Sequence, residues 1–268
     1  MSSIHTRVGQ IGLAMTGNGP ATPILFLHGV GSDKRVWQAQ LDHFGSTRRA
    51  MAIDYPGYGE SDPNPEATRD DFARAALATL DALTIERAHI CGLSLGGVVA
   101  IAMHALAPTR CASLILADSF AVHPDGQAIY DRSVAASHAM SMRALAEARA
   151  PSLVGAEAHE AVKCEVIATM ATIDPAAYRR GAEAVWLADQ RDRATAIDVP
   201  TLVVVGEEDR ITPPSLSRAL VDLVGTAPAA RRDAKLEIIA QAGHLANLEQ
   251  PAAFNRVLED FITIFDVI

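Results

Sequence analysis

The sequence predicts an α/β fold, with a mostly parallel central sheet, helices on both faces and a helical cap inserted between two strands. Short apolar runs alternate with amphipathic segments along most of the chain, which is typical of parallel strands joined by crossover helices. The alternation stops in residues 121–195, which are rich in Ala and Arg and carry no strong strand pattern. We therefore expect residues 1–120 and 196–268 to form the core and residues 121–195 to form the cap.

Size and composition exclude several classes of protein. The chain has 268 residues, enough for one large domain with an insertion, and 49% of them are hydrophobic. A net charge of −9 disfavours nucleic-acid binding. No apolar run approaches the roughly 18 residues of a membrane span, and the first residues lack the apolar run of a signal peptide. We expect a cytoplasmic monomer or small homo-oligomer that binds neither nucleic acid nor membranes.

The elements of the core are expected in a regular order. Apolar runs bounded by turn residues suit strands that are buried on both faces, and Trp37 should pack the first helix on the sheet. The expected strands are residues 3–8, 11–15, 23–27, 49–53, 87–91, 113–117, 201–205 and 236–240. The expected helices are residues 34–44, 68–82, 95–107, 214–223 and 252–264. Within the cap we expect several helices, with breaks at Pro151 and Pro175.

One motif points to a nucleophile. Gly92-Leu93-Ser94-Leu95-Gly96 matches G-x-S-x-G, follows the expected strand 87–91 and opens the expected helix 95–107. Such a turn presents the Ser94 hydroxyl at the carboxyl edge of the sheet, where this class of sheet binds ligands. The Leu95 N–H at the helix N-terminus can meet developing negative charge. The alternative is a glycine-rich turn that only caps a helix.

A serine hydroxyl needs a base to take its proton, and the sequence offers nine histidines. His244 is the candidate because it follows the expected strand 236–240 and lies C-terminal to the serine. It could also be a loop histidine without function. Asp209, directly after the expected strand 201–205, is the candidate carboxylate to orient the histidine. Asp118, after the expected strand 113–117, is the main alternative.

The loop after strand 23–27 offers a second donor for an oxyanion. It reads His28-Gly29-Val30-Gly31, and its glycines let the backbone approach a ligand. We expect the Val30 N–H to be the donor and His28 to brace the loop. The three cysteines show no CxxC spacing, so we expect neither a disulfide framework nor a metal site.

Together these motifs resemble the α/β-hydrolase superfamily over nearly the whole chain outside the cap. The resemblance rests on five segments: His28 to Asp33, Asp54 to Ser61, Gly92 to Gly97, Gly206 to Pro213, and Gly243-His244 followed by Glu249-Gln250-Pro251. Within the superfamily, the chain looks most like the 3-oxoadipate enol-lactonase group and its esterase relatives. This resemblance implies an α/β-hydrolase fold, no cofactor, and hydrolysis of a small ester or lactone through an acyl-enzyme on Ser94.

Two other functions stay open. Carbon–carbon bond hydrolases of ring-cleavage pathways use the same triad, but they usually carry a tryptophan just after the histidine, and Leu245-Ala246-Asn247 follows here. A non-catalytic ligand-binding protein on the same scaffold is the third possibility.

The substrate pocket is expected between the elbow and the cap. Its expected lining residues, besides the two oxyanion donors, are Phe120, Met140, Met142, Trp186 and Leu187. Trp186 could stack on a ring-shaped substrate or simply anchor the cap. Arginines on the cap could bind a substrate carboxylate or form a solvated face; these are Arg132, Arg143 and Arg149.

Overall fold

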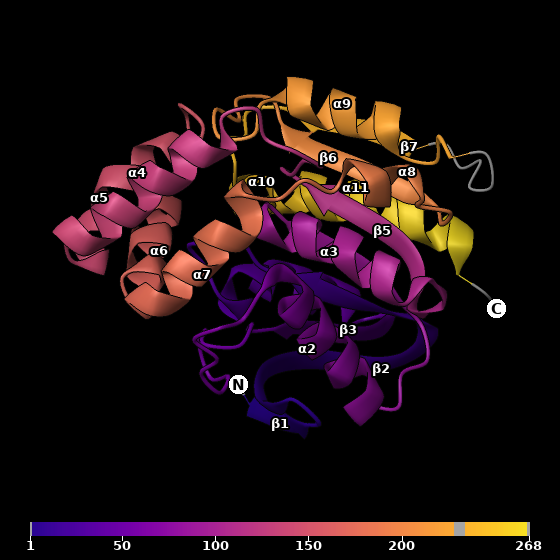
Figure 1. Ribbon diagram of the computed structural model, residues 1–268. Helices are drawn as coiled ribbons and strands as arrows, with labels where there is room; N and C mark the ends of the chain where they lie inside the picture. Colours follow the sequence, from indigo (N-terminus) through magenta and orange to yellow (C-terminus); the bar gives the residue numbers. More distant parts are fainter. Residues whose placement is uncertain (1, 228–233, 267–268) are drawn as a thin grey trace.

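A computed structural model describes residues 2–227 and 234–266, and in this part of the chain a seven-stranded sheet forms the centre of the molecule (Figure 1). The strands are β1 Ser2–Thr6, β2 Gly9–Leu27, β3 Arg48–Ile53, β4 Ala88–Leu93, β5 Cys111–Ala117, β6 Thr201–Gly206 and β7 Ala234–Ile239. Their order is β1-β2-β4-β5-β6-β7, with β3 paired to β2. The pairs from β2 through β7 are parallel, and β1 is antiparallel to β2. The mostly parallel sheet is therefore confirmed.

Strand β2 differs from the prediction, because the second and third expected strands form one continuous element. Its two halves both pair with Ala52 of β3, through Ala14 and Phe26. Gly17 lies between the halves with φ of 68°, and a Cβ there would come within 2.3 Å of the Arg48 carbonyl oxygen. This left-handed glycine lets the chain bend while it keeps its pairing with β3.

Helices cover both faces of the sheet, as predicted. Successive residues of a strand point to opposite faces of the sheet. Leu25 therefore packs in one apolar core with Phe72 of α2, and Phe26 packs in the other with Phe254 of α11. Trp37 is fully buried and stacks on Phe26, with ring centroids 4.9 Å apart. The helices of the core are α1 Gln38–Phe44, α2 Arg69–Ala82, α3 Leu95–Leu106, α8 Arg191–Thr195, α9 Pro214–Leu223, α10 Ala246–Glu249 and α11 Pro251–Ile262.

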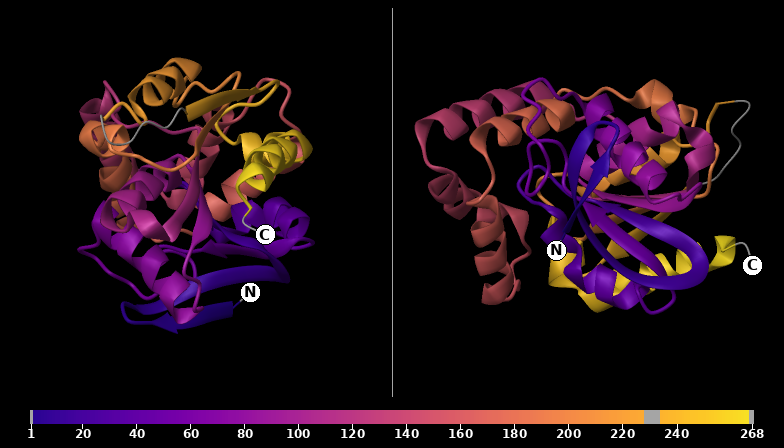
Figure 2. Two further views of the ribbon diagram at one scale, coloured as in Figure 1. Left: turned by 90° about the vertical axis from the view of Figure 1, so that its right-hand side faces the viewer. Right: turned by 90° about the horizontal axis from the view of Figure 1, so that it is seen from below.

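The segment between β5 and β6 carries helices that stand at one end of the molecule (Figures 1 and 2). They are α4 Gly126–Ala139, α5 Met142–Leu153, α6 Glu160–Met170 and α7 Pro175–Trp186. Pro175 begins α7 as expected, and the Asp174 side chain caps it. Pro151 does not break its helix, because a proline in the last turn removes only one helical hydrogen bond.

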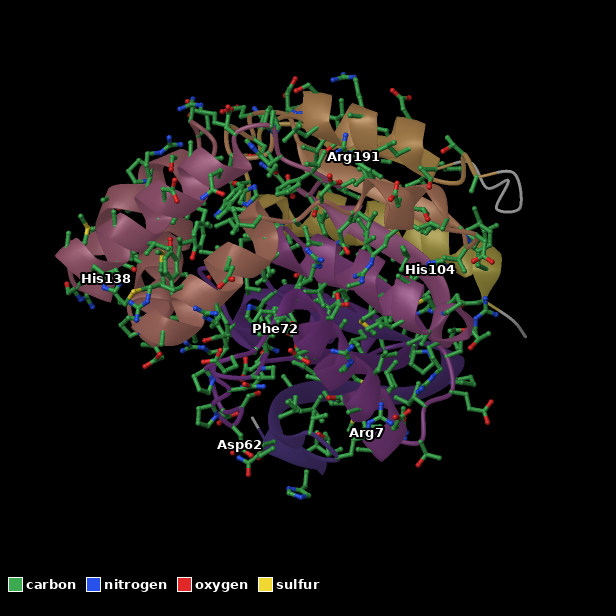
Figure 3. All side chains as sticks on the ribbon, in the orientation of Figure 1. Arg7, Asp62, Phe72, His104, His138 and Arg191 are labelled. Atoms are coloured by element: carbon green, nitrogen blue, oxygen red, sulfur yellow. The ribbon has the colours of Figure 1, made fainter. Side chains whose placement is uncertain are left out.

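One buried histidine of the core has a side-chain partner. His104 of α3, labelled in Figure 3, is buried and forms a 2.9 Å hydrogen bond with Asp198. It is a structural histidine and not a base. Within the described residues, no helix is both long and apolar enough to cross a membrane.

Candidate active site

Ser94 lies on a sharp turn between β4 and α3. Its φ is 55°, in the left-handed region that non-glycine residues rarely occupy, and its side chain is 3% exposed. The turn is held by hydrogen bonds from Ser94 N to the Ala117 carbonyl and from Ser119 Oγ to the Ser94 carbonyl, at 2.9 and 2.8 Å. A Cβ at Gly92 would come within 2.1 Å of the Gly96 carbonyl oxygen, so the tight turn requires glycine there.

His244 and Asp209 lie together at the ends of two neighbouring strands. His244 follows β7, Asp209 follows β6, and His244 Nδ1 is 2.9 Å from Asp209 Oδ2. Thr212 Oγ1 donates to the same carboxylate oxygen at 2.7 Å. The backbone N–H groups of Ile211 and Thr212 donate to Asp209 Oδ1 at 2.8 and 2.9 Å. The carboxylate is thus fully engaged and fixes one nitrogen of the imidazole.

The electrostatics of Asp209 favour its charged form. Burial alone would raise the pKa of Asp209, but the charge and hydrogen bond of His244 and the donors of Thr212 together hold it well below the usual value. Asp209 is therefore a carboxylate throughout the neutral range, which suits a group that stabilises a protonated histidine.

Asp118 lies in the same cluster, and ligand atoms of Asp118, Asp209 and His244 are within 4.8 Å of one another. Among the described residues, His244 bonds to Asp209 and not to Asp118, which favours Asp209 as its partner. Burial, followed by the charge of Asp209, raises the pKa of Asp118 well above the ordinary value. This shift favours the protonated form of Asp118 over its carboxylate. The three groups could hold a cation, but the hydrogen bonds of Asp209 and His244 already account for the arrangement.

The loop after β2 approaches the serine closely. A Cβ at Gly29 would lie 3.5 Å from the Ser94 Cβ. Within the described part of the chain, the N–H groups of Val30 and Leu95 donate no hydrogen bond to the protein, so both are free for a ligand oxygen. His28 braces the loop: its Nδ1 contacts the Gly29 carbonyl at 2.8 Å, and its Nε2 accepts from Tyr55 N at 3.4 Å. Burial lowers the pKa of His28.

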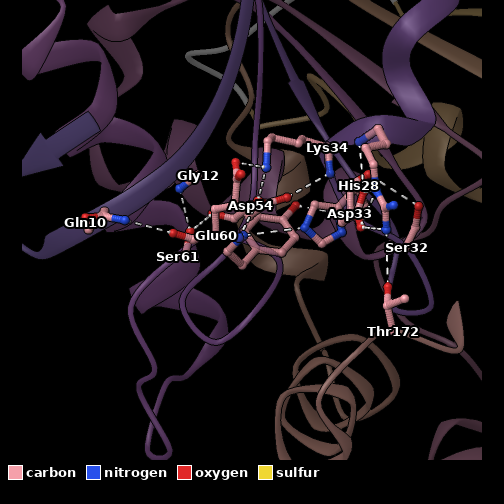
Figure 4. A network of polar contacts seen from close by, with 12 residues as sticks. Gln10, Gly12, His28, Ser32, Asp33, Lys34, Asp54, Glu60, Ser61 and Thr172 are labelled. Carbon is pink, nitrogen blue, oxygen red and sulfur yellow. Dashed lines mark hydrogen bonds and ion pairs between the residues drawn. The ribbon is translucent and has the colours of Figure 1, made fainter. Parts of the chain in front are cut away.

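A network of charged side chains, partly buried, lies beside this loop (Figure 4). Lys34 Nζ contacts Asp54 Oδ2 at 2.5 Å and Glu60 Oε2 at 2.8 Å, and Asp54 also accepts from Lys34 N at 2.9 Å. Asp33 binds Arg35 through both carboxylate oxygens. Desolvation works against the charged form of Lys34, but its two carboxylate partners outweigh it and raise the Lys34 pKa. The network positions the loop, and sequence analysis assigned it no role.

Ser94 and His244 line one pocket, here called the inner pocket, together with residues of the cap. Its apolar lining comes from Val30, Val36, Leu93, Leu153, Val166, Met170, Trp186, Ile211, Leu245 and Leu248. Of the cap residues that the sequence suggested for substrate binding, Arg149 and Trp186 lie on this wall. Phe120 stacks on Trp186, with ring centroids 5.8 Å apart.

The remaining expected lining residues do not reach the inner pocket. Met142 is buried within the cap, whereas Met140 and Leu187 are 40% and 42% exposed on its outer surface. These three side chains do not reach the wall that holds Ser94 and His244, because Met140 and Leu187 lie just past the ends of α4 and α7 and Met142 begins α5. Helical spacing alone could have indicated Val166 and Met170, four residues apart on α6.

Glutamates that sequence analysis left without a role join the histidine loop to the cap. Glu249 accepts the N–H of Gly155 at 2.7 Å and the N–H of Gly243 at 2.9 Å. Glu208 accepts the N–H of Ala156 at 2.8 Å. The backbone N–H of His244 also donates to the Leu153 carbonyl, at 3.0 Å. The position of His244 therefore depends on the α5–α6 loop.

Comparisons with known proteins identify the family and the fold of the chain. A family model for the alpha/beta hydrolase family matches residues 24–257. The 3-oxoadipate enol-lactonase 1 of Acinetobacter baylyi is 29% identical, with 98% of both chains covered. A 2-hydroxymuconate semialdehyde hydrolase from a Pseudomonas strain is also 29% identical, over 93% of this chain and 89% of that protein. The enol-lactonase structure from Burkholderia xenovorans has a TM-score of 0.88 and 26% identity, covering 98% of this chain and all of that one. The predicted fold is confirmed, and the chain belongs to the alpha/beta hydrolase family.

Proposed function

We propose that this protein is a serine hydrolase that cleaves a small carboxylic ester or lactone through an acyl-enzyme on Ser94. One observation carries the proposal: a serine at positive φ shares a pocket with a histidine that is hydrogen-bonded, at 2.9 Å, to a buried carboxylate. A serine becomes a useful nucleophile only with such a base. The likeness to enol-lactonases supports a carbonyl–oxygen bond as the target.

The proposed reaction has two steps. Because Asp209 occupies His244 Nδ1, Nε2 takes the Ser94 Oγ proton while Oγ attacks the carbonyl carbon. The N–H groups of Val30 and Leu95 stabilise the oxyanion, and His244 then protonates the leaving oxygen. In the second step His244 takes a proton from water, which attacks the acyl carbon and releases the acid and Ser94. These steps require no cofactor.

The proposal is tested with a panel of p-nitrophenyl esters and small lactones, comparing the wild type with Ser94→Ala. We expect the wild type to turn over at least part of the panel and the variant to lose roughly 10⁴-fold or more in kcat, with an unchanged circular dichroism spectrum. A folded Ser94→Ala variant with near-normal turnover would overturn the assignment.

Carbon–carbon bond hydrolysis is the second candidate, because the 2-hydroxymuconate semialdehyde hydrolase relative has the same 29% identity to this chain as the enol-lactonase relative, although over a smaller share of both chains. The residue after His244 is Leu245, where those enzymes usually carry tryptophan. Product analysis on a ring-cleavage diketone separates the two functions. Cleavage of the diketone at a rate above that of the best ester would favour the second.

A further inference from the structure

Thr212 takes part in the hydrogen bonds that join Asp209 to His244, although sequence analysis gave it no role. It belongs to the loop between β6 and α9, where two prolines follow it, and it is fully buried. Its backbone N–H and its side-chain hydroxyl both act on the Asp209 carboxylate. A buried residue that uses both of its donors on one catalytic group is a candidate for a role in the reaction.

The two donors of Thr212 bind different oxygens of that carboxylate. The Thr212 N–H donates to Asp209 Oδ1 at 2.9 Å, and Thr212 Oγ1 donates to Asp209 Oδ2 at 2.7 Å. Because one residue holds both oxygens, the carboxylate plane cannot rotate about the Cβ–Cγ bond without breaking a hydrogen bond. The oxygen that His244 uses, Oδ2, is therefore kept in one direction.

Thr212 Oγ1 also lies beside the imidazole. It is 3.2 Å from His244 Nδ1, which is itself 2.9 Å from Asp209 Oδ2, so the three atoms form a triangle. The hydroxyl has a single proton, and this proton goes to the carboxylate, which can only accept. His244 Nδ1 then carries its own proton toward Asp209 Oδ2. This arrangement leaves Nε2 as the basic nitrogen of His244.

We propose that Thr212 is a positioning residue, which directs Asp209 at His244 and reduces the effective charge that the imidazole meets. This inference rests on the proposed function, in which His244 is the general base. Hydrogen bonds to a carboxylate stabilise its charge. A carboxylate with one donor fewer attracts the second proton of the imidazole more strongly. Without the Thr212 hydroxyl, His244 should therefore stay protonated to a higher pH, and less free base should be present at neutral pH.

Other charged side chains also lie near His244, on the elements packed around it. They are Asp118 after β5, Glu208 after β6, Glu249 of α10, Arg149 of α5 and Glu165 of α6. The carboxyl groups favour the protonated imidazole when they are charged, whereas the arginine disfavours it. A substitution at Thr212 leaves all of these groups in place. A change in the pH profile that follows such a substitution therefore reports the Thr212 hydroxyl.

The test compares Thr212→Val, which keeps the branched shape but lacks the hydroxyl, with Thr212→Ser, which keeps the hydroxyl. We expect Thr212→Val to lower kcat for an ester by about 10-fold, with KM changed by less than about 2-fold. The acid limb of its kcat/KM profile should move to higher pH. Thr212→Ser should keep the wild-type limb and recover most of the kcat. If Thr212→Val does not fold, the smaller Thr212→Ala should show the same shift of the limb.

Thr201→Val is the matched control for the loss of a buried threonine hydroxyl. Thr201 is buried at the start of β6, and its hydroxyl donates to the Val199 carbonyl, away from the site. We expect this variant to leave both kcat and the acid limb unchanged. Equal losses in Thr201→Val and Thr212→Val, or in Thr212→Ser and Thr212→Val, would show that Thr212 has only a structural role, which would overturn the inference.

A measurement on the imidazole itself separates this inference from the proposed function. NMR titration of isotope-labelled histidines follows the protonation of His244, whose signal is assigned by its absence from His244→Ala. A titration of His244 that moves to higher pH in Thr212→Val, but not in Thr212→Ser, supports the inference even if no ester is turned over. A titration that is the same in the wild type and Thr212→Val would overturn it, while the proposed function stands.

Discussion

The site around Ser94 and the cap above it are held by different forces. The Asp209 carboxylate receives hydrogen bonds from Ile211, Thr212 and His244, all between 2.7 and 2.9 Å. Trp186, the cap residue on the opposite wall, is held by packing, and its indole N–H has no hydrogen-bond partner among the described residues. Directional hydrogen bonds thus hold the catalytic groups in place, whereas packing holds this wall of the substrate pocket. Mutations in the wall should therefore cost less activity than mutations of the catalytic groups.

The largest effect should come from replacing the carboxylate that holds His244 in place. Asp209→Asn should lower kcat by about 10⁴-fold, because the amide holds the imidazole in the wrong tautomer. Asp118→Asn makes the same chemical change in the same cluster, but at a carboxyl that, among the described residues, does not bond to His244. We expect it to cost no more than about tenfold, the worth of one hydrogen bond. The kinetics of ester hydrolysis by both variants test this, and equal losses in kcat would contradict the assignment of Asp209 as the partner of His244.

The hydrogen bonds that join the His244 loop to the cap should have the next largest effect. Gly155 and Gly243 donate to different carboxylate oxygens of Glu249, and Glu249→Gln replaces one of these oxygens with an NH₂ group that cannot accept. We expect the variant to lower the free energy of unfolding by about 1–3 kcal/mol and to lower kcat as His244 loses its position. Urea unfolding and ester kinetics measure the two effects. Glu157→Gln is the control: Glu157 is exposed on the α5–α6 loop that also carries Gly155, and its replacement should change neither quantity. A Glu249→Gln variant with unchanged stability and kcat would show that these hydrogen bonds do not position His244.

Changes on the cap side should shift selectivity more than rate. Trp186→Phe enlarges the inner pocket, and we expect the preferred acyl chain to lengthen, with kcat/KM ratios between neighbouring chain lengths changing roughly tenfold. Leu187→Ala, next in sequence but exposed and outside the inner pocket, should leave the ratios unchanged. Kinetics over an alkanoate ester series check both. An unaltered profile for Trp186→Phe would show that this wall does not contact the acyl chain.

The smallest predicted effect concerns pH. The folded pKa of Asp118 is raised above its unfolded value of about 3.9, so the folded state holds a proton that the unfolded chain releases. Its contribution to stability is complete below pH 4 and declines as the pH rises. Asn does not titrate, so Asp118→Asn should gain stability relative to the wild type between pH 4.5 and pH 7.5. Urea unfolding at both values measures this, and a difference that does not vary with pH would contradict it.

The sequence predicted the core and the site more fully than the cap. Each residue of the proposed triad follows a strand of the sheet, and parallel strands bring their carboxyl ends to one edge, so order along the chain was enough to place Ser94, Asp209 and His244 at that edge. In the cap, Met140 and Leu187 were placed in the pocket but lie outside, because the direction of a side chain on a short helix depends on tertiary packing. The role of Glu249 could not be predicted, since its partners are backbone groups of distant loops.

The most direct test of the central claim is covalent labelling with a fluorophosphonate, followed by mass spectrometry of the labelled peptide. We expect a single label on Ser94, and a competing ester should slow the labelling. The label should be strongly reduced in His244→Ala and absent from Ser94→Ala. Labelling of a different residue, or a folded wild-type protein that takes up no label, would contradict the assignment of Ser94 as an activated nucleophile and leave the scaffold with a binding role.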